Sequence, residues 1–173
     1  SILNLISTAN TAFGRIGKLV DRMHEMNEKF NEDEDVSTEE ERTEIGILGG
    51  SLYEIMQLTI KGYTAKSSSI SQTIRCYREE IMDLASICKK RYIKRMHEKG
   101  LEMDPDNQFT DTSYILEQLI DYCDMIADAL IRYHVEIGEE EKSDTVTDEK
   151  IRKNIHMLFE DKYEAIGIGK DKI

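Results

Sequence analysis

The sequence predicts an all-α protein, an antiparallel up-and-down bundle of four long helices followed by a shorter C-terminal helix. Apolar residues recur at steps of three and four over long stretches, which is the pattern of amphipathic helices. The 173 residues include one proline and no tryptophan, a composition that favours long helices over a sheet. No segment shows a strand pattern, and the connections expected between the helices are short, as in antiparallel bundles.

The first two helices are expected over residues 2–30 and 38–63, with an acidic break at residues 31–35 between them. Ser37 and Glu40 have the spacing of a capping box, which predicts that the second helix begins there. The apolar stripe of the first helix consists of Ile6, Phe13, Ile16, Val20, Met23 and Phe30. The second helix contains three glycines, for which we expect close contact with another helix, with a kink as the alternative: Gly46, Gly49 and Gly50.

The remaining helices are expected over residues 69–99, 111–137 and 148–163. Ser69 with Gln72 should cap the third helix, and Asp111 or Thr112 the fourth. We therefore expect a bundle over residues 1–137. We expect residues 138–173 to form an acidic linker and a final helix packed on that bundle.

The charge balance excludes some classes of partner. A net charge of −12 argues against non-specific binding to nucleic acid or anionic lipid.

The cysteines and the apolar segments indicate the kind of compartment. No CxxC pair occurs among the three cysteines, Cys76, Cys88 and Cys123, and we expect them to be reduced core residues of an intracellular protein. No apolar run approaches the roughly 18 residues of a membrane span, and no signal peptide is visible. Because the chain opens at once in an amphipathic helix without an initiator methionine, we expect it to be part of a larger protein.

The fourth helix carries a stripe of acidic residues. Glu117, Asp121, Asp124 and Asp128 follow at steps of four, three and four, which places their carboxylates within an arc of roughly 60°. Like charges at this spacing destabilise a helix by a few tenths of a kcal/mol per pair. No basic residue lies between Leu101 and Ile131, so we expect the compensating charge to come from outside the helix.

A metal ion is one candidate for that charge. The third helix carries Glu79 and Asp83 at i, i+4, and an antiparallel neighbour could bring this pair level with Glu117 and Asp121. Four converging carboxylates in a partly dry groove require a cation. Oxygen ligands suit Mg²⁺, Ca²⁺ or Mn²⁺, and a ferric ion is a further option. The alternative is that these acids are exposed, and that Arg75, Arg78 or a neighbouring helix pairs with them.

The sequence offers no set of catalytic residues. It contains no glycine-rich phosphate loop, no credible Ser/His/Asp or Cys/His combination, and no Glu-x-x-His motif of the di-iron bundles. We therefore expect a protein that is not an enzyme.

Two segments resemble the acidic signatures of PhoU domains. Residues 117–128, EQLIDYCDMIAD, are similar to the third-helix signature E-R-I-x-D-x-x-x-N-I-A-E, and residues 79–83, EEIMD, to the E-x-x-I-D element of the preceding helix. The resemblance implies one full three-helix repeat over residues 38–137. Residues 1–31 are similar to a remnant of a preceding repeat, in which Gly14 and Lys18 occupy the positions where acids would fall.

The resemblance implies an all-α bundle, PhoU-like or spectrin-like, with a non-enzymatic regulatory role in bacterial phosphate uptake or homeostasis. It also implies metal binding through Glu79, Asp83, Glu117 and Asp121, with Asp124 and Asp128 as further candidates, and a divalent or ferric ion as cofactor. The expected partner is the membrane portion of a sodium/phosphate symporter-like protein, or a phosphate-signalling protein, and a homodimer is also considered. Such a domain would be cytoplasmic, tethered to the inner face of the membrane by an N-terminal transmembrane region. The alternatives are a stand-alone PhoU-type regulator and a metal-free helical module that binds other proteins.

Overall fold

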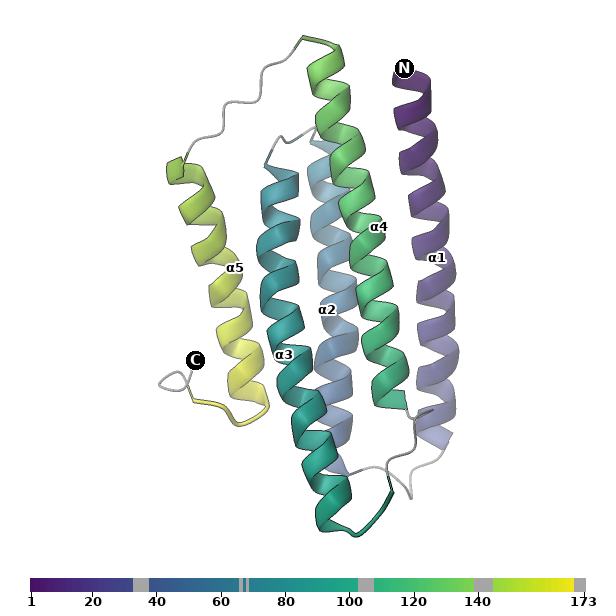
Figure 1. Ribbon diagram of the computed structural model, residues 1–173, viewed down its shortest axis with the longest axis vertical. Coiled ribbons are helices and arrows are strands. Elements are labelled where there is room, and N and C mark those ends of the chain that lie inside the picture. The colour runs from purple at the N-terminus through teal and green to yellow at the C-terminus, as the bar shows by residue number, and fades with distance from the viewer. Residues whose placement is uncertain (33–37, 66, 68, 103–107, 139–144, 170–173) are drawn as a thin grey trace.

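The computed structural model describes the chain except for residues 33–37, 66, 68, 103–107, 139–144 and 170–173, and except for the side chains of residues 30–32, 108 and 145–147. In the described part all regular structure is helical (Figure 1), so the predicted all-α class is confirmed. The helices are α1 (Ile2–Glu32), α2 (Glu39–Thr64), α3 (Ile70–Glu98), α4 (Gln108–Glu136) and α5 (Thr145–Ala165).

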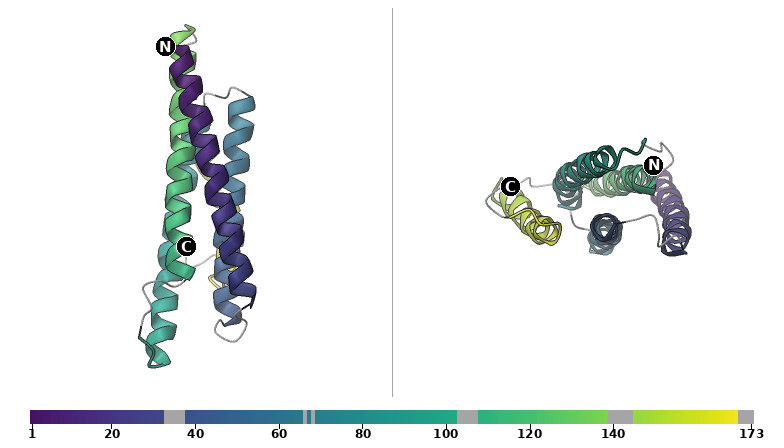
Figure 2. Two further views of the ribbon diagram at one scale, coloured as in Figure 1. Left: turned by 90° about the vertical axis from the view of Figure 1, so that its right-hand side faces the viewer. Right: turned by 90° about the horizontal axis from the view of Figure 1, so that it is seen from below.

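Helix α4 packs against α1, α2 and α3, and α5 packs against α3. The end-on view in Figure 2 places α1 and α5 at opposite edges, with the other three helices between them. Helices α1 and α4 run in opposite directions: the amine of Ser1 lies 3.3 Å from Glu136 Oε1, and Arg15 Nη1 lies 3.4 Å from the Tyr122 hydroxyl. The helices therefore lie side by side over most of their length.

One continuous core joins the five helices, as the apolar stripes require. In α4, apolar residues that recur at helical spacing are all buried and form its centre: Leu116, Ile120, Cys123, Ala127 and Leu130. Helix α5 closes the far side of the core with Phe159, whose ring meets that of Tyr77 edge-on at a centroid distance of 5.0 Å. The three cysteines are free and buried, as predicted.

Some of the predicted helix starts were wrong in detail. The capping box of α2 is formed by Thr38 and Glu41, one residue later than the predicted pair; Ser37 lies outside the described residues. Ser69 is the N-cap residue of α3, as predicted, but its side chain makes no capping hydrogen bond; its hydroxyl lies 2.8 Å from that of Ser67. Helix α4 begins at Gln108, so Asp111 and Thr112 lie inside it. Each error has the same cause: several Ser, Thr and Asp residues precede these helices, and spacing alone does not choose among them.

Close helix contact does not account for the three glycines of α2 singled out from the sequence. A Cβ added at Gly49 would lie 3.4 Å from Met23 Cε of α1, an ordinary van der Waals contact with the end of a flexible side chain, and Gly46 and Gly50 have no such neighbour within 4 Å. The tight contact occurs instead at Gly62, where a Cβ would lie 2.7 Å from Ile70 Cγ1. That glycine lets the first residue of α3 pack against the last turns of α2.

None of the helices, as far as the described residues extend, combines the length and the apolar character needed to cross a bilayer.

Candidate functional site

The acidic stripe of α4 lies on the side of that helix turned away from the core. Glu117, Asp121 and Asp128 are exposed, and Asp124 is partly buried. These residues alternate with the buried apolar stripe at helical spacing, so the packing that buries the apolar side turns the carboxylates outward.

Arg78 of α3 supplies the positive charge that the stripe lacks. Its two terminal nitrogens donate hydrogen bonds to different carboxylates, Nη2 to Asp121 Oδ1 and Nη1 to Asp124 Oδ2. For Asp121 and Asp124, the expectation that a group outside α4 offsets the repulsion is thus confirmed, and that group is one of the arginines weighed against a metal ion.

Burial and charge oppose each other at this pair. Burial raises the pKa of the Asp124 carboxyl above its ordinary value, and the charge and hydrogen bond of Arg78 offset only part of that rise. Partial burial would by itself lower the pKa of Arg78, but its bonds to Asp121 and Asp124 raise it. A fixed cation at this position therefore stabilises the ionised stripe.

The acidic pair of α3 faces a different neighbour. Glu79 Oε2 lies 2.7 Å from Arg152 Nη1 of α5. Asp83 is exposed, and its charge, after burial and the charge of Glu80, contributes to raising the pKa of Tyr163 to about 12. Glu79 and Asp83 therefore lie toward α5, whereas Asp121 and Asp124 lie toward Arg78.

The described residues contain no group of three or more His, Cys, Asp or Glu side chains placed to hold a metal ion. As arranged, the six predicted ligands do not fit one coordination sphere. Asp121 and Asp124 bind Arg78, and Glu79 binds Arg152. Asp128 forms an ion pair with Arg132 of its own helix, with 2.9 Å between Asp128 Oδ2 and Arg132 Nε. Metal binding by Glu117, Asp121, Glu79 and Asp83 stays a prediction, and the arrangement gives it no support.

A second ion-pair cluster was missed from the sequence. The basic end of α3 was interpreted as a solvated end suited to the helix dipole, yet Arg91 and Arg95 reach back to the first turns of α2. Arg91 Nε lies 2.9 Å from Glu44 Oε1, and Arg95 binds Glu44 and also lies within 3.6 Å of Glu40. Glu44 has a side-chain exposure of only 1%. The acidic first turns of α2 were the available signal, since an antiparallel neighbour would bring them to the end of α3.

This cluster also anchors α5. Arg91 Nη1 donates a hydrogen bond of 2.6 Å to the carbonyl of Ile166, just beyond the end of α5. One arginine therefore joins α2, α3 and the end of α5, and we interpret the cluster as structural.

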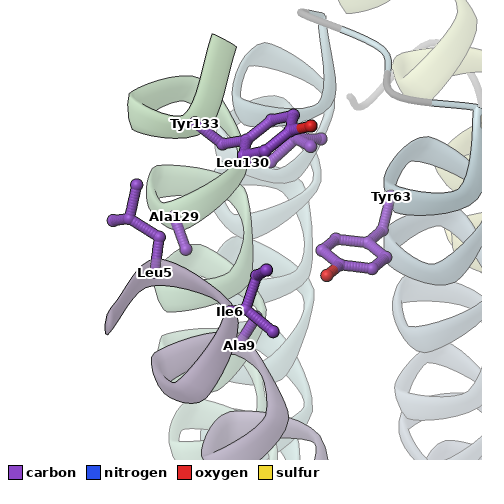
Figure 3. Close-up of a pocket in the computed structure, with 7 residues that line it drawn as sticks. All are labelled: Leu5, Ile6, Ala9, Tyr63, Ala129, Leu130 and Tyr133. Atoms are coloured by element: carbon purple, nitrogen blue, oxygen red, sulfur yellow. The ribbon is translucent and has the colours of Figure 1, made fainter. Parts of the chain in front are cut away.

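The third feature is an apolar groove between α1, α4 and the end of α2 (Figure 3). Its volume is about 210 Å³. Figure 3 shows Tyr63 of α2 facing the side chains of the other two helices across the open space. The lining residues are Leu5, Ile6 and Ala9 from α1, Tyr63 from α2, and Ala129, Leu130 and Tyr133 from α4.

Comparison with protein-family models, with curated proteins and with solved structures finds no significant match for this chain. The resemblance to PhoU domains therefore rests on the two acidic segments and their spacing, and membership of that family stays a prediction.

Proposed function

We propose that the chain is a non-enzymatic regulatory domain in phosphate uptake or homeostasis, a PhoU-like antiparallel up-and-down bundle that acts by contacting a transporter or a signalling protein. In this proposal residues 38–137 are a complete three-helix repeat, and residues 1–31 are the remnant of another.

The mutual packing of α2, α3 and α4 is the observation that carries this proposal. Each of these helices contacts the other two, as the members of a single three-helix unit would. The acidic segments that resemble the PhoU signatures lie on α3 and α4, which Arg78 joins directly. Helices α1 and α5 are added at opposite edges of this unit.

Phosphate uptake provides the direct test. We expect deletion of the segment that encodes residues 1–173, with the rest of its gene left in place, to raise phosphate uptake in phosphate-rich medium, because a regulator of this class restrains the transporter. Restoring the segment should restore the restraint. Uptake that is the same with and without the segment, at both high and low phosphate, would refute the proposal.

The membrane-tethered form and the stand-alone form of the regulator differ in what precedes Ser1 in the gene. We favour the form tethered to the inner face of the membrane, as the cytosolic part of a sodium/phosphate symporter-like protein. A run of apolar segments encoded before Ser1 would support the tethered form, and a start codon beside it would support the stand-alone regulator.

The arrangement of charges favours a version of this function without a resident ion, since Arg78 already neutralises part of the stripe. Thermal melts with and without a chelator test this, because an ion that binds only the folded state raises its stability by mass action. We expect equal melting temperatures, and no metal by elemental analysis. A lower melting temperature in chelator, with metal lost on Asp83→Ala or Asp121→Ala, would instead establish the metal-binding form.

A further inference from the structure

Helix α5 lies at one edge of the molecule and packs along α3, whereas α4 packs against α1, α2 and α3 (Figure 2). The opposite side of α5 faces solvent, where Met157 is 55% exposed and Leu158 39%. A helix held on one side can detach without unfolding the rest, because local stability follows the contacts that a segment makes. The buried residues of α5 and of the residue just beyond it form one stripe at steps of four, four and three: Ile155, Phe159, Tyr163 and Ile166.

The surface beneath α5 is an apolar strip with an acidic rim. The strip includes Tyr77 of α3, whose ring meets that of Phe159 edge-on and whose hydroxyl lies 2.9 Å from Glu54 Oε1 of α2. Basic side chains of α5 lie against the rim. The contacts are Arg152 with Glu79 at 2.7 Å, His156 with Glu80 at 2.8 Å, and Lys162 with Glu54 at 3.3 Å. In all three the nitrogen comes from α5 and the carboxylate from α2 or α3, so α5 matches this surface in charge as well as in its apolar stripe.

We propose that α5 is an internal ligand, and that the surface beneath it is a binding groove for an amphipathic helix of a partner protein. That helix carries apolar residues at four-residue spacing with cations beside them, the pattern by which α5 itself fits the groove. When α5 leaves, Glu54, Glu79 and Glu80 lose their basic partners, so an apolar helix without cations does not replace it.

The partner helix and α5 compete for the groove. The apparent affinity for the partner is therefore reduced by the fraction of molecules in which α5 is detached. Any change that weakens the attachment of α5 tightens the binding of the partner. This inference rests on the fold and on the contacts of α5, and does not require the proposed role in phosphate uptake.

The cysteines of the chain measure the detachment of α5. Burial raises the pKa of the Cys76 thiol, and the charges of Arg152 and Asp148 of α5 also act on it, which places the thiol beside that helix. Cys76 is 2% exposed, and Cys123, in the central stripe of α4, is 0% exposed. In the full chain we expect iodoacetamide to modify Cys76 at least about tenfold faster than Cys123, with mass spectrometry assigning the sites. Equal rates would mean that α5 leaves only when the whole protein unfolds, and would overturn the proposal.

A fluorescent peptide of residues 148–169 is the probe for the groove. We expect fluorescence anisotropy to detect its binding to the full chain. Arg152→Glu combined with Lys162→Glu should tighten that binding by at least about fivefold, because the two charge reversals detach the internal α5. Arg132→Glu is the matched control: Arg132 is 67% exposed and forms an ion pair on α4, and its reversal should leave the peptide affinity unchanged.

A reversal on the groove side distinguishes a binding site from a loosened helix. Glu79→Arg breaks the same ion pair as Arg152→Glu, but it damages the groove instead of the internal ligand. We expect this variant to bind the unaltered peptide at least about threefold more weakly than the α5 variant does. A peptide that carries Arg152→Glu should recover the loss, because the two reversed charges attract again.

Slow modification of Cys123 in each variant verifies that the fold is intact. The proposal is overturned if neither the unaltered chain nor the α5 variant binds the peptide, or if Arg132→Glu tightens binding as much as the α5 reversals do. It is also overturned if the affinity does not depend on the charge at residue 79, or if size-exclusion chromatography shows that only dimers with exchanged α5 helices bind the peptide. The phosphate-uptake test does not depend on these outcomes.

Discussion

Two arginines of α3 bind carboxylates of a neighbouring helix in very different surroundings. The Arg95 side chain is 12% exposed and binds Glu44, which is 1% exposed. The Arg78 side chain is 39% exposed, and its partners Asp121 and Asp124 are 59% and 41% exposed. The chemistry of the two pairings is the same, so burial decides what each contributes. Breaking a buried ion pair leaves a charged group that neither water nor a partner stabilises. When an exposed pair is broken, water solvates the remaining charge, so the loss of stability is smaller.

The largest expected effect is at Glu44. Replacing it by glutamine removes the charge and leaves the shape, so Arg91 and Arg95 lose their shared buried partner. We expect a loss of about 3 kcal/mol in the free energy of unfolding, measured by urea denaturation. A loss below about 1 kcal/mol would mean that water reaches this cluster and that the two sites do not differ in kind.

An intermediate effect is expected at Arg78. Arg78→Met leaves Asp121 and Asp124 facing each other without a cation, and we expect a loss of about 1 kcal/mol at pH 7. This loss should become smaller as the pH falls below the ordinary pKa range of carboxyl groups, because protonated Asp121 and Asp124 carry no charge for the guanidinium to neutralise. A loss independent of pH would show that Arg78 acts through packing of its aliphatic stem.

A smaller and oppositely directed effect is expected at Asp124. Because burial raises its pKa in the folded state, the folded protein binds this proton more tightly than the unfolded chain does. The stability contributed by Asp124 is therefore present below the unfolded value and lost as the pH rises through the folded one. Compared with Asp124→Asn, the unaltered protein should lose stability between pH 3 and 7, by less than the effect at Arg78, because the Asp124 side chain is 41% exposed and solvent screens its interactions.

Parallel urea denaturations of both proteins across that range provide the measurement. If the free energy of unfolding of the unaltered protein instead increases relative to that of Asp124→Asn as the pH rises, then the attraction of Arg78 affects the pKa of Asp124 more than burial does.

The smallest effect is expected at Asp128, which provides the exposed reference. Asp128 pairs with Arg132 within one helix, and their side chains are 60% and 67% exposed. Asp128→Asn should change the free energy of unfolding by no more than about 0.5 kcal/mol. A change as large as that at Arg78 would show that the whole acidic stripe acts as one coupled unit.

Residues within one helix were largely predictable. Apolar spacing along residues 114–134 gives the buried side of α4, because residues three and four apart share a side of any α-helix. The same periodicity places Glu117 and Asp121 outside, and the lack of basic residues nearby predicts a compensating charge from elsewhere. Helix ends were less predictable, as the shift of the capping box to Thr38 shows.

The tertiary structure alone decided which neighbour each charged residue meets. The helical period fixes the direction of Glu79 about its own axis, but the rotation and register of two helices depend on how all their ridges and grooves pack. That packing directs Glu79 to Arg152, Arg78 to the acidic stripe, and Arg95 to Glu44. The sequence by itself determined five amphipathic helices and their apolar sides, since these follow from local geometry. Whether an arginine or an ion meets the carboxylates depends on contacts between residues far apart in the chain, which only the folded core brings together.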